Sequence, residues 1–436
     1  MVLLTGAALR AQDAGAAAPQ AAPTPQAEYG GPANLDRGGE ATVLHGGEHL
    51  TLTPFVAAMG EYSSDFGGYG ATGLFGVLGG HDWSTSELKL DYHGLYQWYS
   101  NVSGEDGLDN VVNVSYTHQF NARLGLDLTE DLARVHNSYS LPFGSLYGGT
   151  GSFDPLYNAL AGTGISNTPT LGSVGGARLV YQMTARWSFS AGVTGIFSRQ
   201  YFTETLGVNG EVASADASYR LNRYQTIGLT YSYTHFSFLG QLGRTNMHAV
   251  GASYATRLGR RWEFSVYAGA TRADSLRGTT VQLDPTLAQL LGFSTVFEIM
   301  HTTYYTPYGE ARLVRAFRRG SWDAHYVRSV MPGNGLFATS STESADTGYA
   351  YTGLRRLTLQ AGAGYNRATA LTQTLGRYRG LSANGGFAYS IGRGFALAGH
   401  AGWNDYSVAA SNLAQKGYDA GMGLSWNPGT VPLPIW

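Results

Sequence analysis

The sequence predicts an all-β fold: a transmembrane antiparallel up-and-down β-barrel of about 18 strands, with 16 strands as the alternative. Composition is the first reason. Only 13% of its 436 residues are charged, against about a quarter in soluble domains, and 61 are Gly and 29 Tyr. Mean hydropathy is −0.15, and no apolar run is as long as a membrane-spanning helix. A membrane barrel dilutes its lipid-facing residues with polar lumen residues, which gives such an average. A soluble propeller is the competing fold.

One hairpin, Asn110–Glu130, shows the repeating unit most clearly. Its first arm alternates apolar and polar residues from Val112 to Phe120, and its second arm does the same from Leu124 to Thr129. Such alternation is typical of a strand with one apolar and one polar face. Only Asn121–Arg123 separates the arms, which predicts an antiparallel hairpin.

Arginines that precede apolar strand starts recur along the chain and provide the third reason. They are spaced 37 residues apart in two sets of three: Arg186, Arg223 and Arg260, then Arg319, Arg356 and Arg393. Thirty-seven residues hold two strands of about a dozen residues, one tight turn and one longer loop. A propeller blade of that length would hold four strands, so the period favours the barrel.

The chain divides into three parts. Residues 1–12 are predicted to be the remnant of a signal peptide, and residues 13–48 a flexible Ala/Pro/Gly-rich segment. Residues 49–436 are predicted to form the barrel. Large loops are predicted at about His136–Leu171, Ala273–Met300 and around Ser340, the last of these with the acids Glu343 and Asp346.

No catalytic motif stands out. The 11 histidines show no recurring spacing to an acid or nucleophile, and no His, Asp or Glu cluster has metal-ligand spacing. The sequence therefore predicts a protein that is not an enzyme and binds no cofactor or metal. A formal charge of −2 gives no reason to expect nucleic acid.

Strand parity instead assigns charged residues to the lumen, where they would set selectivity. These are Glu87, Lys89, Asp91, His93, Asp127, Arg178, Glu263, Asp323, His325 and Asp419. A barrel of about 18 strands is too wide for side chains to fill, so a water-filled channel lined by both signs of charge is expected. Solvated wall residues without selectivity are the alternative.

The chain ends Asn427-Pro-Gly-Thr-Val-Pro-Leu-Pro-Ile435-Trp436. Together with the alternating strands, this end resembles Gram-negative outer-membrane β-barrel proteins, in particular a porin-like group, over about residues 28–436. The resemblance implies an outer-membrane location and a final aromatic residue that the barrel-assembly machinery reads, which Trp436 matches. Pro432 and Pro434 depart from the pattern, because proline is not expected to continue a paired strand.

The leading prediction is a porin-like channel for passive diffusion of small hydrophilic solutes. A polysaccharide-export barrel, or a surface scaffold or adhesin with a plugged lumen, are the alternatives. Outer-membrane lipids are expected as partners, and arginines at periplasmic turns are expected to pair with lipid headgroups. These arginines are Arg123, Arg186, Arg223, Arg260, Arg319, Arg356 and Arg393.

Overall fold

The computed structural model describes residues 49–434 except 65–66, 102–105, 136–169, 201–206, 240–242, 283–285, 287–288, 290–293, 333–338, 371–376, 410–413 and 429–430. The described residues form almost entirely β-structure. The strands are β1 (His49–Ser63), β2 (Gly68–Asp82), β3 (Ser86–Tyr99), β4 (Gly107–Asn121), β5 (Leu124–Val135), β6 (Thr170–Gln182), β7 (Trp187–Gln200), β8 (Gly207–Asn222), β9 (Gln225–Leu239), β10 (Gly243–Leu258), β11 (Trp262–Gln282), β12 (Thr295–Phe317), β13 (Gly320–Pro332), β14 (Thr339–Leu354), β15 (Leu357–Ala370), β16 (Arg377–Gly392), β17 (Phe395–Val408), β18 (Ala414–Trp426) and β19 (Val431–Pro434). Within this part of the chain, no helix has the length and apolar character needed to cross a membrane.

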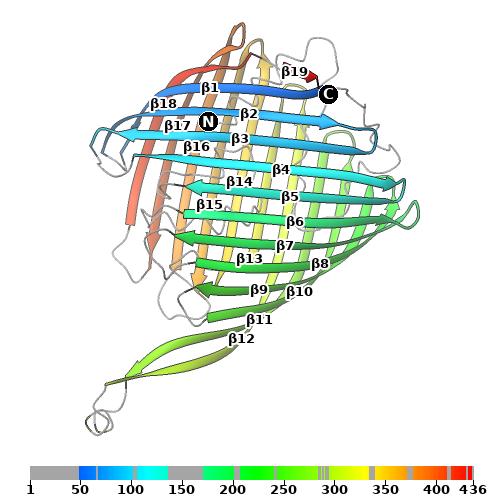
Figure 1. Ribbon diagram of the computed structural model, residues 1–436, viewed down its shortest axis with the longest axis vertical. Coiled ribbons are helices and arrows are strands. Elements are labelled where there is room, and N and C mark those ends of the chain that lie inside the picture. The colour runs from blue at the N-terminus through cyan, green and yellow to red at the C-terminus, as the bar shows by residue number, and fades with distance from the viewer. Residues whose placement is uncertain are drawn as a thin grey trace.

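The sheet closes on itself as a barrel of 18 strand positions. From β1 to β18 each strand pairs antiparallel with the next, and β1 pairs with β18, where Ser63 lies opposite Asp419. Figure 1 shows the near strands crossing the far strands, as expected when tilted strands wrap round a barrel. Closure leaves no sheet edge along most of its circumference. The predicted fold and the larger of the two predicted strand numbers are confirmed.

The C-terminal prolines differ from expectation. β19 continues along the same edge of β1 as β18, with Pro432 opposite Thr51 and Pro434 opposite His49. The prediction that these prolines cannot continue a paired strand is wrong. They are two residues apart, so both missing N–H groups lie on the same side of the strand, and the pairing with β1 can use the other side. Trp436 lies outside the described residues.

Short turns and long connections gather at opposite ends of the barrel. In Figure 1 the turns joining β4 to β5 and β6 to β7 lie on the right, the side of the C-terminus. All seven predicted turn arginines lie in short turns at this end. Arg356 and Arg393 adopt positive φ angles of 69° and 52° in two-residue turns, the left-handed conformation that tight hairpins of this kind require. That this end faces the periplasm remains a prediction.

The region predicted as a loop over Ala273–Met300 is largely a ribbon, since β11 and β12 stay paired from Trp262–Arg315 out to Gln282–Thr295. The ribbon projects past its neighbours at the lower left of Figure 1. On β12, the pairing with β13 starts only at Gly309. Pro307 lies just before this point, and because it has no N–H it cannot donate a hydrogen bond to β13. The predicted placement of Ser340, Glu343 and Asp346 in a loop is also wrong, because β14 already begins at Thr339.

Candidate channel lumen

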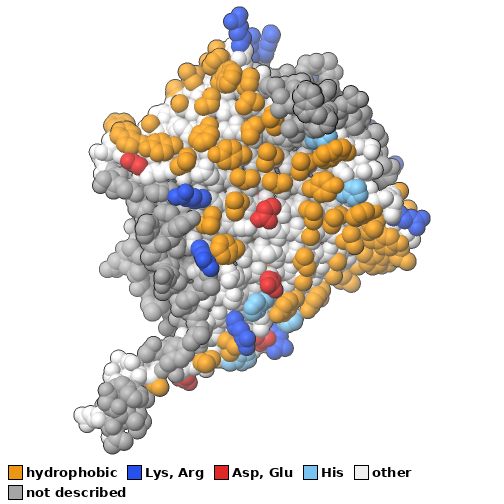
Figure 2. Space-filling view, viewed as in Figure 1, with side chains coloured by type: hydrophobic (Ala, Val, Ile, Leu, Met, Phe, Trp, Pro, Cys, Tyr) orange, Lys and Arg blue, Asp and Glu red, His pale blue; other side chains and the backbone are white. Residues whose placement is uncertain are grey.

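The strand register separates two faces, because residues paired across antiparallel strands point to the same side of the sheet. One face carries large apolar side chains that remain exposed, among them Leu229 (65%), Val193 (60%) and Val250 (59%). Figure 2 shows apolar side chains spread over the face of the barrel in view. The other face therefore lines the lumen. An apolar belt round a closed barrel is the outer surface that a lipid bilayer requires.

All ten side chains that the sequence assigns to the lumen lie on the inward face. Asp91, for example, lies opposite Leu78 and Asn113, and Asp127 lies opposite Arg178. The set is distributed over six strands: Glu87, Lys89, Asp91 and His93 on β3, Asp127 on β5, Arg178 on β6, Glu263 on β11, Asp323 and His325 on β13, and Asp419 on β18. Their role in selectivity remains a prediction.

The register adds inward charges that the sequence reading missed. These are the carboxylates Glu61, Asp82, Asp109, Asp131, Asp216, Glu310 and Asp346, the cations Arg220, Arg257 and Arg312, and His400. Glu310 and Arg312 were missed because Thr302–Phe317 mixes polar and apolar residues on both faces. Asp346 was missed because it was assigned to a loop. Among the described residues of the closed wall, leaving out the projecting part of the β11–β12 ribbon, thirteen carboxylates and five Lys or Arg face inward.

Arg178 illustrates how the lining holds its charges. Its Nη2 donates to Ser190 Oγ at 2.8 Å, and Ser190 Oγ donates to Asp216 Oδ2 at 2.9 Å. Arg178 Nη2 is itself 3.5 Å from Asp216 Oδ2. The three side chains come from β6, β7 and β8, so the contact ties consecutive strands together across the inner wall. Two other inward cations are also paired with acids, Lys89 with Glu87 of the same strand at 2.6 Å and Arg257 with Glu263 of the next strand at 2.9 Å.

His325 sits at the centre of an acidic group on another part of the wall, formed by β12, β13 and β14. Its Nε2 is 3.0 Å from Glu310 Oε1 on β12, and its Nδ1 is 3.6 Å from Asp346 Oδ1 on β14. A similar pair joins His400 to Asp419 at 3.2 Å. Over the described residues, no group of three or more His, Asp or Glu side chains is arranged to hold a metal ion. The group is therefore a charged patch of the wall.

Solvent reaches the charged part of the lining. The Lys89 side chain is 64% exposed and the Glu263 side chain 42% exposed, although both point inward. Towards the long connections many inward side chains are apolar and pack against one another round the wall: Val111, Ala133, Val135, Val174, Ile196, Val208, Phe236, Met247 and Ala273. The inward carboxylates Glu61, Asp109 and Asp131 also lie at this end. A second buried cluster, which includes Phe55, Met59, Leu74 and Leu95, continues this zone over β1–β3. The lumen therefore has a charged, wet zone and an apolar zone.

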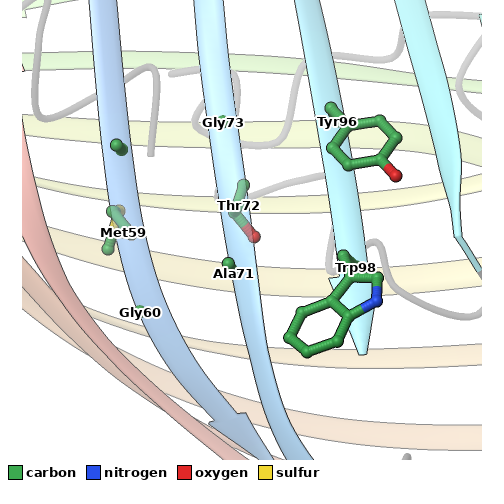
Figure 3. A pocket seen from close by; sticks show the side chains of 8 residues that line it. Met59, Gly60, Ala71, Thr72, Gly73, Tyr96 and Trp98 are labelled. Atoms are coloured by element: carbon green, nitrogen blue, oxygen red, sulfur yellow. The ribbon is translucent and has the colours of Figure 1, made fainter. Parts of the chain in front are cut away.

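A groove of about 530 Å³ lies on the outer side of β1–β3. Figure 3 shows Tyr96 and Trp98 projecting from β3 beside small residues of β1 and β2. A Cβ added at Gly60 or Gly73 would meet no atom within 4 Å, so the floor of the groove is open to the outside. Because Tyr96 and Trp98 belong to the outward face, this groove faces the bilayer and is separate from the solute path.

Some of the turn arginines contact aromatic rings at the edge of the apolar belt. The Arg223 guanidinium lies 4.7 Å from the centre of the Tyr224 ring, and Arg186 Nη1 donates to the Tyr219 hydroxyl at 3.3 Å. Such contacts hold planar guanidinium groups where an aromatic girdle meets the headgroup region. The proposed pairing of these arginines with lipid phosphates remains a prediction.

No family model and no curated protein matches the chain. Solved outer-membrane proteins resemble it at low identity, among them the following three. OccK5 (OpdH) of Pseudomonas aeruginosa is 13% identical, with 89% of this chain and 99% of that chain covered and a TM-score of 0.42. OccAB4 of Acinetobacter baumannii is 12% identical, with 89% and 99% covered and a TM-score of 0.40. The ferric-catecholate import receptor Fiu of E. coli K12 is 9% identical, with 86% and 81% covered and a TM-score of 0.43.

The nature of this molecule follows from its own geometry. Eighteen antiparallel strand positions close without an open seam. The outside of the barrel is apolar, and the inside carries charged side chains that water reaches. Closed barrels with these two faces are characteristic of the outer membrane of Gram-negative bacteria. The chain is a transmembrane outer-membrane β-barrel whose inner wall carries charged side chains.

Proposed function

We propose that the barrel is a passive channel for small hydrophilic solutes and that its lining favours cations. The excess of carboxylates on the inward face is the observation that supports this proposal. The inward face carries thirteen carboxylates but only five Lys or Arg. Three of these five cations are already paired with acids, namely Lys89, Arg178 and Arg257. The net charge of the inward face is therefore negative. Rings of Asp and Glu side chains favour cations in membrane pores, because their field raises the local cation concentration.

Planar-bilayer recordings test both parts of the proposal. We expect stable ohmic steps, and in a KCl gradient a reversal potential of the sign that K⁺ permeability exceeding Cl⁻ permeability produces. Asp91→Asn removes an inward carboxylate that is 34% exposed and should move the reversal potential towards zero. Glu211→Gln is the matched control, because Glu211 is an exposed carboxylate on the outward face of β8. Equal shifts for both variants, or anion selectivity of the wild type, would contradict the lining assignment.

The alternatives make different predictions in the same recordings. A surface scaffold or adhesin with a plugged lumen would give no ohmic steps. The projecting β11–β12 ribbon is the observation that favours this alternative, since it extends past the neighbouring strands. A polysaccharide-export barrel would conduct ions, and added polysaccharide would block the current. The channel proposal assigns no catalytic residue and needs no cofactor; its partners are membrane lipids, the barrel-assembly machinery and the solutes.

A further inference from the structure

Outward-facing arginines mark the border of the apolar belt on the side of the long connections. Eight described arginines share this position: Arg134, Arg199, Arg244, Arg272, Arg328, Arg367, Arg377 and Arg379. Figure 2 shows Lys and Arg side chains along this border on the face in view. These arginines are at the opposite end of the barrel from the turn arginines.

The strand sequences define the height of this border. On β15 the outward residues run from Leu357 through Tyr365 without a charge, and the next outward residue is Arg367. A strand tilted by about 45° rises roughly 2.3 Å per residue along the barrel axis, so these ten residues span about 23 Å. The apolar band of such barrels is about 25 Å tall. Arg367 therefore lies where the acyl chains end and the headgroups begin.

Four of these arginines lie near one another on neighbouring strands, and two of them contact one carboxylate. Glu343 on β14 receives Arg328 Nη1 of β13 at 3.0 Å and Arg367 Nη1 of β15 at 3.6 Å. Arg379 on β16 lies directly opposite Arg367, and Arg377 is the next outward residue. Glu343 and the four arginines together carry three net positive charges. Within the described residues, no ion pair involves Arg377 or Arg379.

Two arginines directly opposite each other destabilise a sheet unless an anion lies between them. The cluster therefore has the form of an anion site, since Glu343 holds two guanidinium groups in place while Arg377 and Arg379 remain exposed. Guanidinium forks match phosphate oxygens in a bidentate geometry, and several of them around one group favour a doubly charged anion.

We propose that the cluster of Arg328, Arg367, Arg377 and Arg379 binds the phosphate groups of an anionic lipid in the leaflet at this end of the barrel. The fitting ligand is a phosphorylated glycolipid, with its phosphates on the arginines and its acyl chains on the barrel wall below. The wall there is apolar and continuous with the belt: the outward residues next towards the short turns are Tyr326, Ala345, Tyr365 and Leu381. Headgroup and acyl chains are thus accommodated by one surface. The site does not depend on whether the lumen conducts.

Native mass spectrometry of the detergent-purified full chain tests the proposal with three probes: bisphosphorylated lipid A, its dephosphorylated form and inorganic phosphate. The test variant is the double substitution Arg377→Gln/Arg379→Gln. The matched control, Arg199→Gln/Arg244→Gln, removes the same charge from the same border but away from the cluster. The wild type should bind the bisphosphorylated lipid more tightly than the dephosphorylated form. At about 1 kcal/mol for each arginine, the test variant should lose roughly 10- to 30-fold in affinity, and the control less than about threefold.

Three results would overturn the proposal. Equal losses in both double variants would mean diffuse attraction to a basic border. Equal binding of the phosphorylated and dephosphorylated lipids would remove the phosphate from the interaction. Binding of inorganic phosphate with the same dependence on Arg377 and Arg379 would make this a site for soluble anions. If the double variant does not fold, as judged by heat-modifiable gel mobility, Arg379→Gln alone is measured in the same way.

Discussion

Replacing Leu128 by arginine should be among the most damaging single changes on the outer face of β5. Leu124 opens this strand beside the short turn, and Arg134 stands at the far border of the belt. At roughly 2.3 Å of rise per residue, Leu128 is about 9 Å from one edge and about 14 Å from the other. It is therefore close to the bilayer midplane. An arginine at that depth costs about 2–4 kcal/mol, whereas Leu124→Arg at the interface should cost about 1 kcal/mol or less.

Urea titration of refolding into lipid vesicles measures these differences. Asp127→Asn is the parity control, because Asp127 is the adjacent inward residue, and its effect on folding should stay within about 0.5 kcal/mol. A loss of folding free energy that is larger for Leu128→Arg than for Leu124→Arg, and near zero for Asp127→Asn, would support both the register and the depth. Equal damage at Leu124 and Leu128 would refute the depth argument. Comparable damage from Asp127→Asn would refute the assignment of the two faces.

Two further predictions concern the outer face and the topology. Ser173 Oγ donates a hydrogen bond of 2.6 Å to the outward carboxylate of Glu130. Ser173→Ala should therefore lower the free energy of unfolding in bilayers by about 1.5–3 kcal/mol, measured by the same urea titration. An unchanged free energy of unfolding would mean that water or lipid replaces the lost donor. Cysteine at Ile299, which is 65% exposed on the projecting ribbon, should react with a membrane-impermeant reagent on intact cells, whereas cysteine at Ala122 should not. The reverse pattern would invert the barrel in the membrane.

The barrel itself could be predicted because its signals are local and repeated. Alternation in segments such as Val112–Phe120 sets the face of each residue, and the inward positions of Asp127 and Arg178 follow from alternation alone. Parity failed where composition does not distinguish the faces. On β12 the outward side includes Pro307 and Gly309, and the inward side Tyr304 and Tyr308, so only the register with β11 resolves it.

The arginine cluster could not be found from the sequence, because its members come from three strands and meet only through pairing. Glu343 was assigned to a loop, since Ser, Thr and acids are common in loops as well as in strands that leave the bilayer. Its contacts with Arg328 and Arg367 depend on the registers of β13 with β14 and of β14 with β15. Register is a non-local property, and no signal within a single strand reports it.

The pairing of β1 with β18 has a consequence for how the chain folds. Ser63 and Asp419 face each other across this seam although 356 positions separate them in the sequence. β19, which lies farther still along the chain, also pairs with β1, and every other pair of neighbouring strands is adjacent in the chain and can form as a hairpin. The closing contacts have the highest contact order in the molecule, and their loop-closure entropy has to be met before they form. Until then the edges of β1 and β18 are open to other chains. The rate at which β1 and β18 pair should therefore limit how fast this barrel folds. Until they pair, the two open edges have to be protected from other chains.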